Sequence, residues 1–418
     1  MLFAHVPAVL IWTISLVSIV CMLLRPRRIA EVYWVCAGAI LLVLTRLLSL
    51  PAAAHAVYAG LEVYLFLAGM MILAALAREE GVFDWVADVA ARHAGHSPGR
   101  LFLLIYLAGT VITALLSNDA TAVVLTPAVL AVVRRAKVEA KPYLLACAFV
   151  ANAAGFVFPI SNPANLVIFD GQMPSLGMWL RIFLLPSLAS ISLTFLCLRW
   201  LTREDLREEL SAQGRRVLLS REGKLAFAGL AIGAAVLVSS SALGFPLGVP
   251  TCCAATFATV IVAWGDKGIP RKVVRGISWS VLPLVAGLFV IVEALQNAGL
   301  LRLGVLGLQA LARTSAWQAK GIAAIVVALL SNGMNNLPVA LMSGAAIRHA
   351  QQSSAVAHAI LIGVDLGPNL SVAGSLATIL WLIALRRERV EISAWEFLKV
   401  GMIAMPAALI AALLFLWN

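Results

Sequence analysis

Long hydrophobic runs recur along the whole chain, and the short connections between them carry most of the charged residues. Eight of these runs are free or nearly free of charge, and each has about twenty residues, the length of a helix that crosses a bilayer. The runs cover residues 3–24, 30–50, 57–77, 178–200, 225–244, 247–264, 278–298 and 394–417. This pattern predicts an all-α, polytopic membrane protein.

Two further hydrophobic regions are each interrupted near the middle by a polar, helix-breaking cluster. The region 100–134 is centred on SNDATAVVLTP (117–127), and the region 320–348 is centred on SNGMNNLP (331–338). Both regions have room for two half-length helices, and the polar backbone between them must lie inside protein or in a water-filled cavity. We therefore expect two re-entrant helical hairpins whose tips are the polar clusters.

Another two regions have the length of crossing helices but contain helix-breaking residues. FPISNPAN (158–165) interrupts the region 143–169, and DLGPNLSVAGS (365–375) interrupts the region 355–384. Proline and glycine end a helix, and the freed backbone groups then need polar partners. We expect each region to cross the membrane as two shorter helices joined by an unwound segment.

The positions of lysine and arginine predict the orientation of these segments. If both hairpins return to the side they entered from and the other ten segments cross, the N-terminus lies outside and most of the 31 lysines and arginines lie inside. Those that fall outside are Arg46, Arg181, Arg302, Arg313, Lys320 and Arg348. Because cytoplasmic loops carry the excess of positive charge, this asymmetry supports the topology.

The two halves of the chain also resemble each other. LAGMMILAALAREEG (67–81) matches VAGLFVIVEALQNAG (285–299), and LLSN (115–118) recurs at 329–332. Each half has an odd number of crossings, so the second half enters the membrane from the opposite face. Such inverted repeats are typical of secondary transporters, which bind their substrate near the bilayer midplane where broken helices meet.

This topology divides the chain into two repeats, residues 1–200 and 225–418, joined by a charged cytoplasmic linker, residues 201–224. Each repeat is expected to contain scaffold spans, an amphipathic connector, and a hairpin with transport spans. In that order the segments are 1–80, 81–99 and 100–200 in the first repeat, and 225–298, 299–320 and 321–418 in the second.

Composition excludes a soluble protein, since 62% of the 418 residues are hydrophobic and 12% are charged, against about 25% charged in a globular protein. The net charge of +11 lies in the short connections, where it sets orientation, so it does not indicate a nucleic-acid partner. The six cysteines have no metal-ligand spacing, and the chain has no Walker A motif. We expect no cofactor, no bound metal and no enzymatic activity.

Several motifs resemble those of a known family. SNDATAVVLTP, SNPANLV, SNGMNNLPVAL and GVDLGPNLSVAGSLATILW are similar to segments of the ArsB-type arsenite efflux pumps of the ion-transporter superfamily. The resemblance implies a multi-pass protein of the bacterial inner membrane, with a scaffold and an elevator-type transport domain. It also implies export of arsenite and antimonite by alternating access, driven by proton antiport or by an associated cytoplasmic ATPase subunit.

Two positions depart from the family pattern. Glu293 stands where a neutral residue is expected, which leaves its role open. Pro163 stands where sodium symporters of the superfamily carry a threonine, which weakens a sodium-symport interpretation.

Two carboxylates, Asp119 and Asp365, lie near the middle of the membrane in this topology. A charged side chain at that depth is costly, so intramembrane acids are candidates for function. Uphill export of a neutral solute needs a charge carrier, and we expect Asp365 to be the first candidate for the proton carrier and Asp119 the second. Alternatively, each aspartate caps the N-terminus of a half-helix, where the helix dipole favours negative charge.

Amides and hydroxyls of the tips and unwound segments are expected to form the substrate pocket. The predicted substrate-binding residues are Asn118, Asn152, Ser161, Asn162, Asn165, Asn332, Asn335, Asn336, Asn369, Ser375 and Thr378. Some of them must instead satisfy the backbone of the broken helices. The remainder would suit a small neutral solute such as As(OH)3. A sodium/proton antiporter or an organic-anion transporter of the same superfamily remains an alternative.

Overall fold

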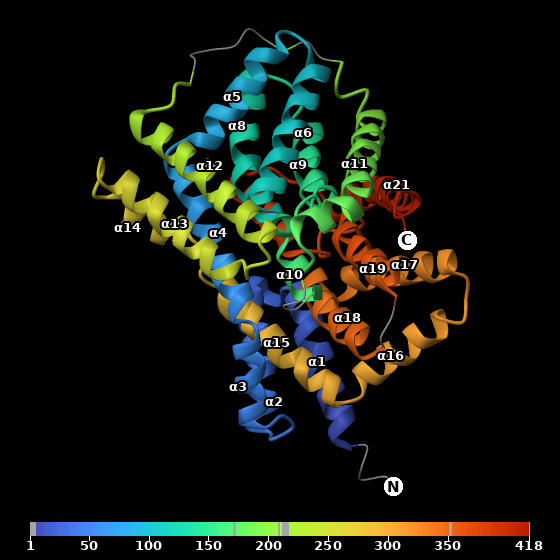
Figure 1. Cartoon of the computed structure of the whole chain (residues 1–418). Helices are drawn as coiled ribbons and strands as arrows, with labels where there is room; N and C mark the ends of the chain where they lie inside the picture. The colour runs from blue at the N-terminus through green and yellow to red at the C-terminus, as the bar shows by residue number, and fades with distance from the viewer. Residues whose placement is uncertain (1–5, 170–172, 208–209, 211–216, 351–352, 418) are drawn as a thin grey trace.

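The computed structural model describes residues 6–169, 173–207, 210, 217–350 and 353–417, and the regular structure in these ranges is entirely helical (Figure 1). The predicted all-α class is therefore confirmed. The helices of the first half are α1 (Val6–Leu24), α2 (Glu31–Leu44), α3 (Leu50–Ala59), α4 (Leu61–Glu79), α5 (Val82–Ala94), α6 (Pro98–Leu115), α7 (Asn118–Ala120), α8 (Thr126–Ala136), α9 (Lys141–Ala153), α10 (Pro163–Phe169) and α11 (Leu176–Leu201).

The second half contains a similar series of helices. Its helices are α12 (Arg221–Ala242), α13 (Gly248–Ala263), α14 (Ile269–Gly276), α15 (Val281–Asn297), α16 (Leu300–Leu311), α17 (Ala316–Met334), α18 (Asn336–Ala350), α19 (Ser354–Leu366), α20 (Leu376–Arg387) and α21 (Ala394–Leu414). Short helical turns lie at Pro26–Arg28, Thr121–Leu125, Pro159–Ser161 and Gly367–Asn369.

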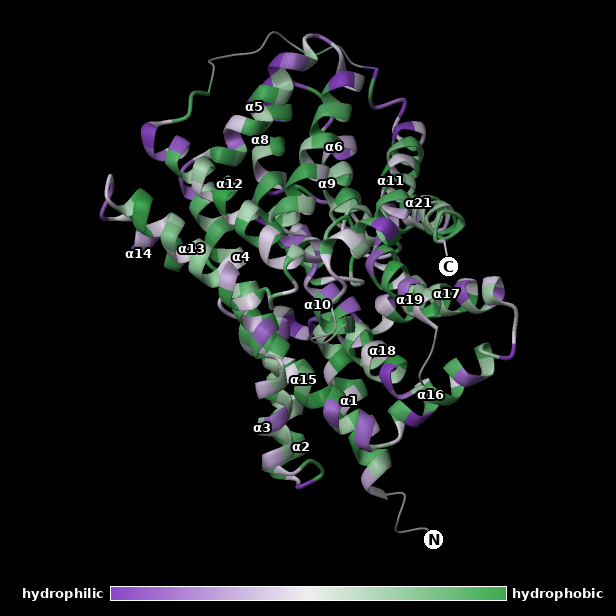
Figure 2. Ribbon diagram, viewed as in Figure 1, coloured by the Kyte–Doolittle hydropathy of each residue, from purple (hydrophilic) through white to green (hydrophobic). Residues whose placement is uncertain are grey.

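Seven helical segments of the described part are long and apolar enough to cross a membrane. They are α1, α4, α6, α11, α12, the segment that joins α14 to α15, and α21. Figure 2 shows hydrophobic residues over outward-facing helices such as α12, α13 and α17, and hydrophilic residues at many helix ends. The chain is a multi-pass membrane protein.

The structure differs from the predicted spans in two connections. The hydrophobic run 30–50 is helical only to Leu44, because the chain turns at Arg46, which has a φ of 57°. Ser49 then starts α3 by accepting a hydrogen bond from the backbone N–H of Ala52 at 3.3 Å. The short helix α14 also lies in a connection with no predicted element, and Pro270 occupies its first turn, where proline is favoured.

All four predicted interruptions lie where helices break. α6 ends at Leu115 and the helix restarts at Asn118, while α17 ends at Met334 and α18 begins at Asn336. Residues 154–162 separate α9 from α10, and residues 367–375 separate α19 from α20. We call residues 117–119 the first tip, 331–336 the second tip, 154–162 the first break and 367–375 the second break.

Local side chains specify these breaks. Ser117 is extended, and its hydroxyl accepts a hydrogen bond from the backbone N–H of Ala120, which starts a new helix. At the second tip Asn335 has a φ of 76°, which no helix continues through. Ser375 and Thr378 form a capping box at the start of α20. The polar clusters therefore end one helix and begin the next.

The helices pack mainly in two groups. In one group α4 contacts α13, α15 contacts α2, and the pairs α1–α2 and α12–α13 complete the set. In the other, α11 contacts α21, α6 contacts α9, and α17 contacts α19. α4 corresponds to α15, and α2 corresponds to α13, so the contacts α4–α13 and α15–α2 are equivalent contacts between the two halves. A two-fold relation between the halves would produce such a pair. The division into scaffold and transport domains and the inverted orientation of the two halves both stay predictions.

Candidate functional site

A small pocket lies where the two tips approach each other between the two groups of helices. Its polar lining residues are Asn118, Asp119, Asn162 and Asn336. Apolar residues of α4, α10, α15, α18 and α20 complete the lining, namely Leu67, Pro163, Val285, Leu337, Leu376 and Ala377. This central pocket therefore combines one carboxylate and three amides with apolar walls.

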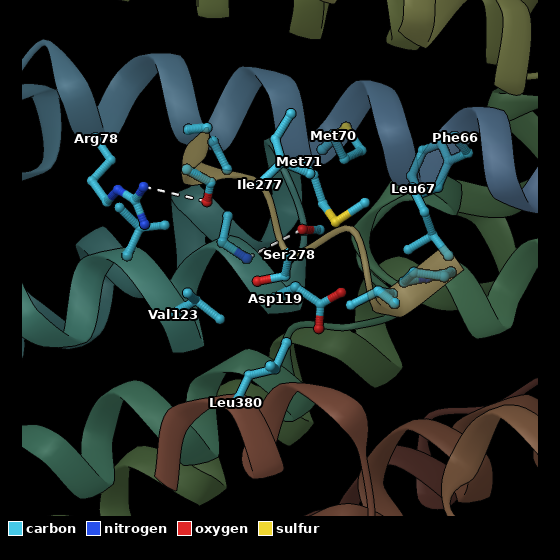
Figure 3. Close-up of a pocket in the computed structure, with 18 residues that line it drawn as sticks. Phe66, Leu67, Met70, Met71, Arg78, Asp119, Val123, Ile277, Ser278 and Leu380 are labelled. Atoms are coloured by element: carbon cyan, nitrogen blue, oxygen red, sulfur yellow. Dashed lines mark hydrogen bonds between the residues drawn. The ribbon is translucent and has the colours of Figure 1, made fainter. Parts of the chain in front are cut away.

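Asp119 is partly exposed and lines both the central pocket and a larger cleft of about 620 Å³, which we call the Arg78 cleft. In Figure 3 its carboxylate points into this cleft between Met71 and Leu380. Arg78 lies at one end and donates a hydrogen bond to the carbonyl of Gly276 at 3.3 Å. The first tip therefore presents an acid to open space.

Asn118 stands next to this acid and is 2% exposed. Its side-chain oxygen Oδ1 has no hydrogen-bond donor among the described residues. A buried polar atom without a partner costs about 1–3 kcal/mol, so such atoms are uncommon in folded proteins. The first tip thus holds an acceptor that a hydroxyl group of a solute could satisfy.

Asp365 is fully buried at the end of α19. Its Oδ1 accepts a hydrogen bond of 2.6 Å from the Nδ2 of Asn162, while its Oδ2 has no partner in the described part of the chain. Gly155 lies beside Oδ2, and a Cβ atom at that position would be 3.2 Å from it. Because Asn162 also lines the central pocket, it connects the buried acid to the pocket.

The amides of α9 and of the second break form a buried chain of hydrogen bonds. Asn152 Nδ2 donates to Asn369 Oδ1 at 3.0 Å, and Asn369 Nδ2 donates to the carbonyl of Phe149 at 3.0 Å. Ser375 Oγ donates to Asn152 Oδ1 at 3.3 Å. Thr378 donates its hydroxyl to the carbonyl of Ser375 at 2.9 Å. Asn152, Asn369 and Ser375 thus hold α9 against the second break.

The second tip is tied to the same break. Asn332 Nδ2 donates to the carbonyl of Gly367 at 2.9 Å, and Ser371 Oγ donates to Asn332 Oδ1 at 2.7 Å. The backbone N–H of Asn336 donates to the carbonyl of Gly374 at 2.8 Å. The tip and the break therefore form one hydrogen-bonded unit.

The remaining predicted residues satisfy freed backbone groups. Ser161 Oγ donates to the carbonyl of Ala114 at 3.1 Å, and Asn165 Nδ2 donates to the carbonyl of Gly155 at 2.8 Å. Asn335 Oδ1 accepts a hydrogen bond from the backbone N–H of Leu337 at 3.3 Å. These three side chains stabilise the breaks rather than line the pocket.

The structure therefore sorts the predicted substrate-binding residues into two sets. Asn118, Asn162 and Asn336 line the central pocket, and Asn152, Ser161, Asn165, Asn332, Asn335, Asn369, Ser375 and Thr378 lie behind it in the supporting network. The sequence analysis missed two serines: Ser371, which donates to Asn332, and Ser278, which lines the Arg78 cleft. Ser371 lies inside the second break, so its position in that polar segment was the available signal.

A second large cleft lies at the other end of α4 and α15. It has a volume of about 1400 Å³ and is lined by Glu62, Glu293 and Arg348 among others. It reaches α10 and α18 through Leu166 and Leu341, and none of the polar residues of the two tips lines it. We call it the Glu293 cleft.

All six cysteines are free, and Cys252 donates its thiol to the carbonyl of Leu65 at 3.0 Å. Within the described residues, no group of three or more histidines, cysteines, aspartates or glutamates could hold a metal ion. The candidate site thus rests on amides and carboxylates.

Comparison of the sequence with known proteins finds membrane transporters. The citrate transporter family, CitMHS, matches residues 8–364. The arsenical pump membrane protein of Yersinia enterocolitica is 30% identical over 356 residues, which cover 80% of this chain and 81% of that protein. The arsenical pump membrane protein of Escherichia coli K12 is 27% identical over 409 residues, 93% of this chain and 94% of that protein.

A solved structure shares the fold. The Alcanivorax borkumensis YdaH transporter superposes with a TM-score of 0.56 at 14% sequence identity, and the match covers 85% of this chain and 84% of that chain. At this identity the likeness concerns the arrangement of helices alone.

Proposed function

Because the chain belongs to the citrate transporter (CitMHS) family of the ion-transporter superfamily, with arsenical pumps among its relatives, we propose that it exports arsenite and antimonite from the cytoplasm by proton antiport. The chain is a multi-pass transporter of the bacterial inner membrane rather than an enzyme. The proposal concerns its substrates, its coupling ion and its conformational cycle.

The lining of the central pocket is the observation that carries this proposal. Three amides and the carboxylate of Asp119 face a pocket with no lysine or arginine among its described lining residues. The hydroxyl groups of As(OH)3 or Sb(OH)3 can donate to Asn118 Oδ1 and Asp119, and their oxygens can accept from the amide groups. A small neutral trihydroxide therefore matches the donors and acceptors present.

The family description gives an organic anion such as citrate as a second candidate. Carboxylate groups are bound most strongly by arginine and lysine, through charge-assisted hydrogen bonds. The central pocket instead contributes the negative charge of Asp119, which would repel such a substrate. Arg78 lines only the adjoining cleft, so the pocket favours the neutral solute.

Asp365 is the proposed proton carrier. A neutral solute gains nothing from the membrane potential, whereas one proton moving inward gains about 2.3 kcal/mol per 100 mV. Asp365 is buried, keeps one oxygen without a partner, and touches the pocket through Asn162. Protonation of that oxygen would weaken its pull on the Asn162 amide and so change the donors that Asn162 offers to the solute.

The two clefts support alternating access with this structure open to the cytoplasm. The Arg78 cleft lies on the side that the charge distribution assigns to the cytoplasm, and it reaches Asp119. The Glu293 cleft lies on the opposite side and reaches the apolar residues Leu166 and Leu341 instead. Movement of the helices that carry the tips would open the second cleft to the pocket and close the first.

Transport into everted membrane vesicles tests the proposed function. We expect arsenite and antimonite to accumulate when the lumen is acidified, without a requirement for sodium and without accumulation of citrate. Vesicles from cells that lack the protein are the control. Accumulation of sodium or of citrate, with none of arsenite, would contradict the proposal.

Thiol labelling tests the proposed topology. In a cysteine-free background, a cysteine at position 134 should react with an impermeant reagent only from the cytoplasmic side, and a cysteine at position 348 only from the periplasmic side. Labelling of both positions from the same side would overturn the two opposed hairpins.

A further inference from the structure

An open basic pocket lies where α6 begins and α11 ends. Arg199, Arg203 and Arg207 line it together with Ser97, Gly99 and Trp200. No acidic residue is among its described lining residues. We propose that this arginine pocket binds the phosphate headgroup of an anionic phospholipid of the inner leaflet, a site separate from the transport pathway.

Arg199 lies in the last turn of α11, and Arg203 and Arg207 follow in the turns after the helix ends at Leu201, where all three line the same pocket. Arg199 lies over the first turn of α6, where its Nη1 donates to the carbonyl of Gly99 at 3.5 Å. A Cβ atom at Gly99 would lie 2.8 Å from that nitrogen, so a larger residue there would push the guanidinium group of Arg199 aside. Within the described ranges none of the three arginines forms a salt bridge.

The start of α6 adds to the positive potential. Ser97 caps the helix by accepting a hydrogen bond from the backbone N–H of Arg100 at 3.3 Å, and α6 continues for 18 residues. The N-terminus of such a helix carries a partial positive charge that favours phosphate. Arginine guanidinium groups add planar, bidentate donors for the same anion.

The surface of α11 indicates a lipid rather than a free phosphate. Leu184, Leu188, Ser192, Leu196 and Trp200 are all exposed and recur every four residues, so they form one stripe along the helix. Leu188, Leu196 and Trp200 are 51%, 56% and 58% exposed. Tryptophan is enriched at the level of lipid headgroups. An acyl chain along this stripe places its phosphate beside Arg199 and Arg203.

Native mass spectrometry of the full-length protein in detergent tests the site with added dioleoyl phosphatidylglycerol and phosphatidylcholine. Each arginine near a headgroup contributes about five-fold in affinity. The triple variant Arg199→Gln, Arg203→Gln, Arg207→Gln should therefore bind phosphatidylglycerol on the order of 100-fold more weakly than wild type. The triple variant Arg386→Gln, Arg387→Gln, Arg389→Gln loses the same charge outside the pocket and should bind as wild type does.

Gly99→Ala is a second variant that keeps every charge and places a methyl group against the guanidinium group of Arg199. It should weaken phosphatidylglycerol binding about five-fold. If the triple variant does not fold, this single variant still tests whether the pocket binds the lipid. Equal binding of phosphatidylglycerol by wild type and both pocket variants would overturn the proposal. So would equal affinity for phosphatidylcholine, or displacement of the lipid by millimolar inorganic phosphate, which would assign the pocket to a soluble phosphate anion.

Discussion

The first and second tips carry the same Ser-Asn pair but place it in different surroundings. At the second tip, Asn332 donates to the carbonyl of Gly367 and accepts from Ser371, so its amide is fully used. At the first tip, Asn118 Oδ1 has no donor among the described residues, and Asp119 faces the Arg78 cleft. The two related sequences therefore differ in their hydrogen bonding, since the second tip is tied to the second break and the first tip keeps an acceptor without a donor.

The two aspartates follow the same division. Asp365 resembles the second tip in being held by its neighbours, because it lies fully buried and accepts a hydrogen bond from Asn162. Asp119 belongs to the first tip and lines the central pocket directly. We infer that coupling and substrate contact are separate tasks, and the following changes test that separation in order of expected effect.

Asp365→Asn should have the largest effect. An asparagine keeps an oxygen to accept from Asn162 Nδ2 but cannot carry a proton. With one proton per cycle, the arsenite gradient sustained by 100 mV, about 50-fold, should fall to none, while downhill exchange of arsenite continues. The measurement is arsenite accumulation in everted vesicles under an imposed gradient. Accumulation equal to wild type would exclude Asp365 as the carrier.

Asp119→Asn should weaken binding without removing coupling. The substitution replaces a charged acceptor by a neutral one, and a hydrogen bond to a charged group contributes about 1.5–3 kcal/mol. We expect the KM for arsenite to rise about 10-fold or more, with the number of protons moved per arsenite unchanged. Loss of coupling in this variant, together with normal coupling in Asp365→Asn, would reverse the two assignments.

Asn118→Ala and Asn332→Ala form a matched pair at corresponding positions of the tips. Asn332→Ala removes hydrogen bonds to Gly367 and Ser371 and should lower the free energy of unfolding by about 2 kcal/mol. Asn118→Ala removes a buried acceptor that has no partner, so the relief of about 1–3 kcal/mol of desolvation cost offsets the packing contacts that are lost. It should therefore not lower the free energy of unfolding as Asn332→Ala does, while it slows transport.

Thermal unfolding in detergent, read beside the initial rate of arsenite transport, separates the two variants. Equal destabilisation by both substitutions would show that the tips are equivalent and that their difference in hydrogen bonding carries no functional meaning.

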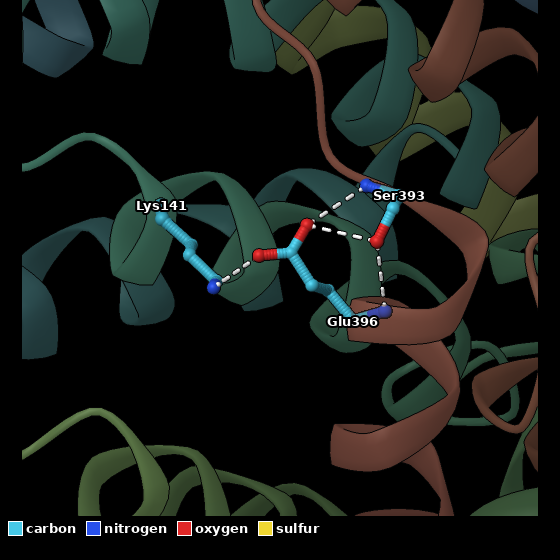
Figure 4. Close-up of polar contacts among 3 residues, drawn as sticks. All are labelled: Lys141, Ser393 and Glu396. Atoms are coloured by element: carbon cyan, nitrogen blue, oxygen red, sulfur yellow. Dashed lines mark hydrogen bonds and ion pairs between the residues drawn. The ribbon is translucent and has the colours of Figure 1, made fainter.

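The smallest effect is expected at an exposed contact between the two halves. Lys141 Nζ donates to Glu396 Oε1 at 2.6 Å, and the two side chains are 35% and 38% exposed (Figure 4). Exposed ion pairs contribute about 0–1 kcal/mol, so Lys141→Gln should lower stability by less than that and leave transport unchanged.

Glu396→Ala is the comparison for this ion pair, because Glu396 also accepts hydrogen bonds from the backbone N–H and the hydroxyl of Ser393. Loss of this capping box should add about 1 kcal/mol to the loss seen for Lys141→Gln. A transport defect in Lys141→Gln would instead give this ion pair a role in the conformational cycle.

The positions of the breaks could be predicted from sequence because their causes are local. Hydrophobic runs of sufficient length become helices in a membrane, and proline, glycine or a capping serine ends them within a few residues. Ser117 and Ser375 start new helices through bonds to residues three positions away. The turn at Arg46 was not predicted, because a hydrophobic run continues on both sides of it.

The all-helical membrane class, the four interrupted regions and the two candidate aspartates follow from the order of residues along the chain. Which amides line the pocket and which support it depends on how the helices pack. The bonds from Asn152 to Asn369 and from Asn162 to Asp365 join residues 217 and 203 positions apart. Amides differ little in intrinsic chemistry, so their partners depend on how the helices of the two halves pack, and no local pattern in the chain records that packing.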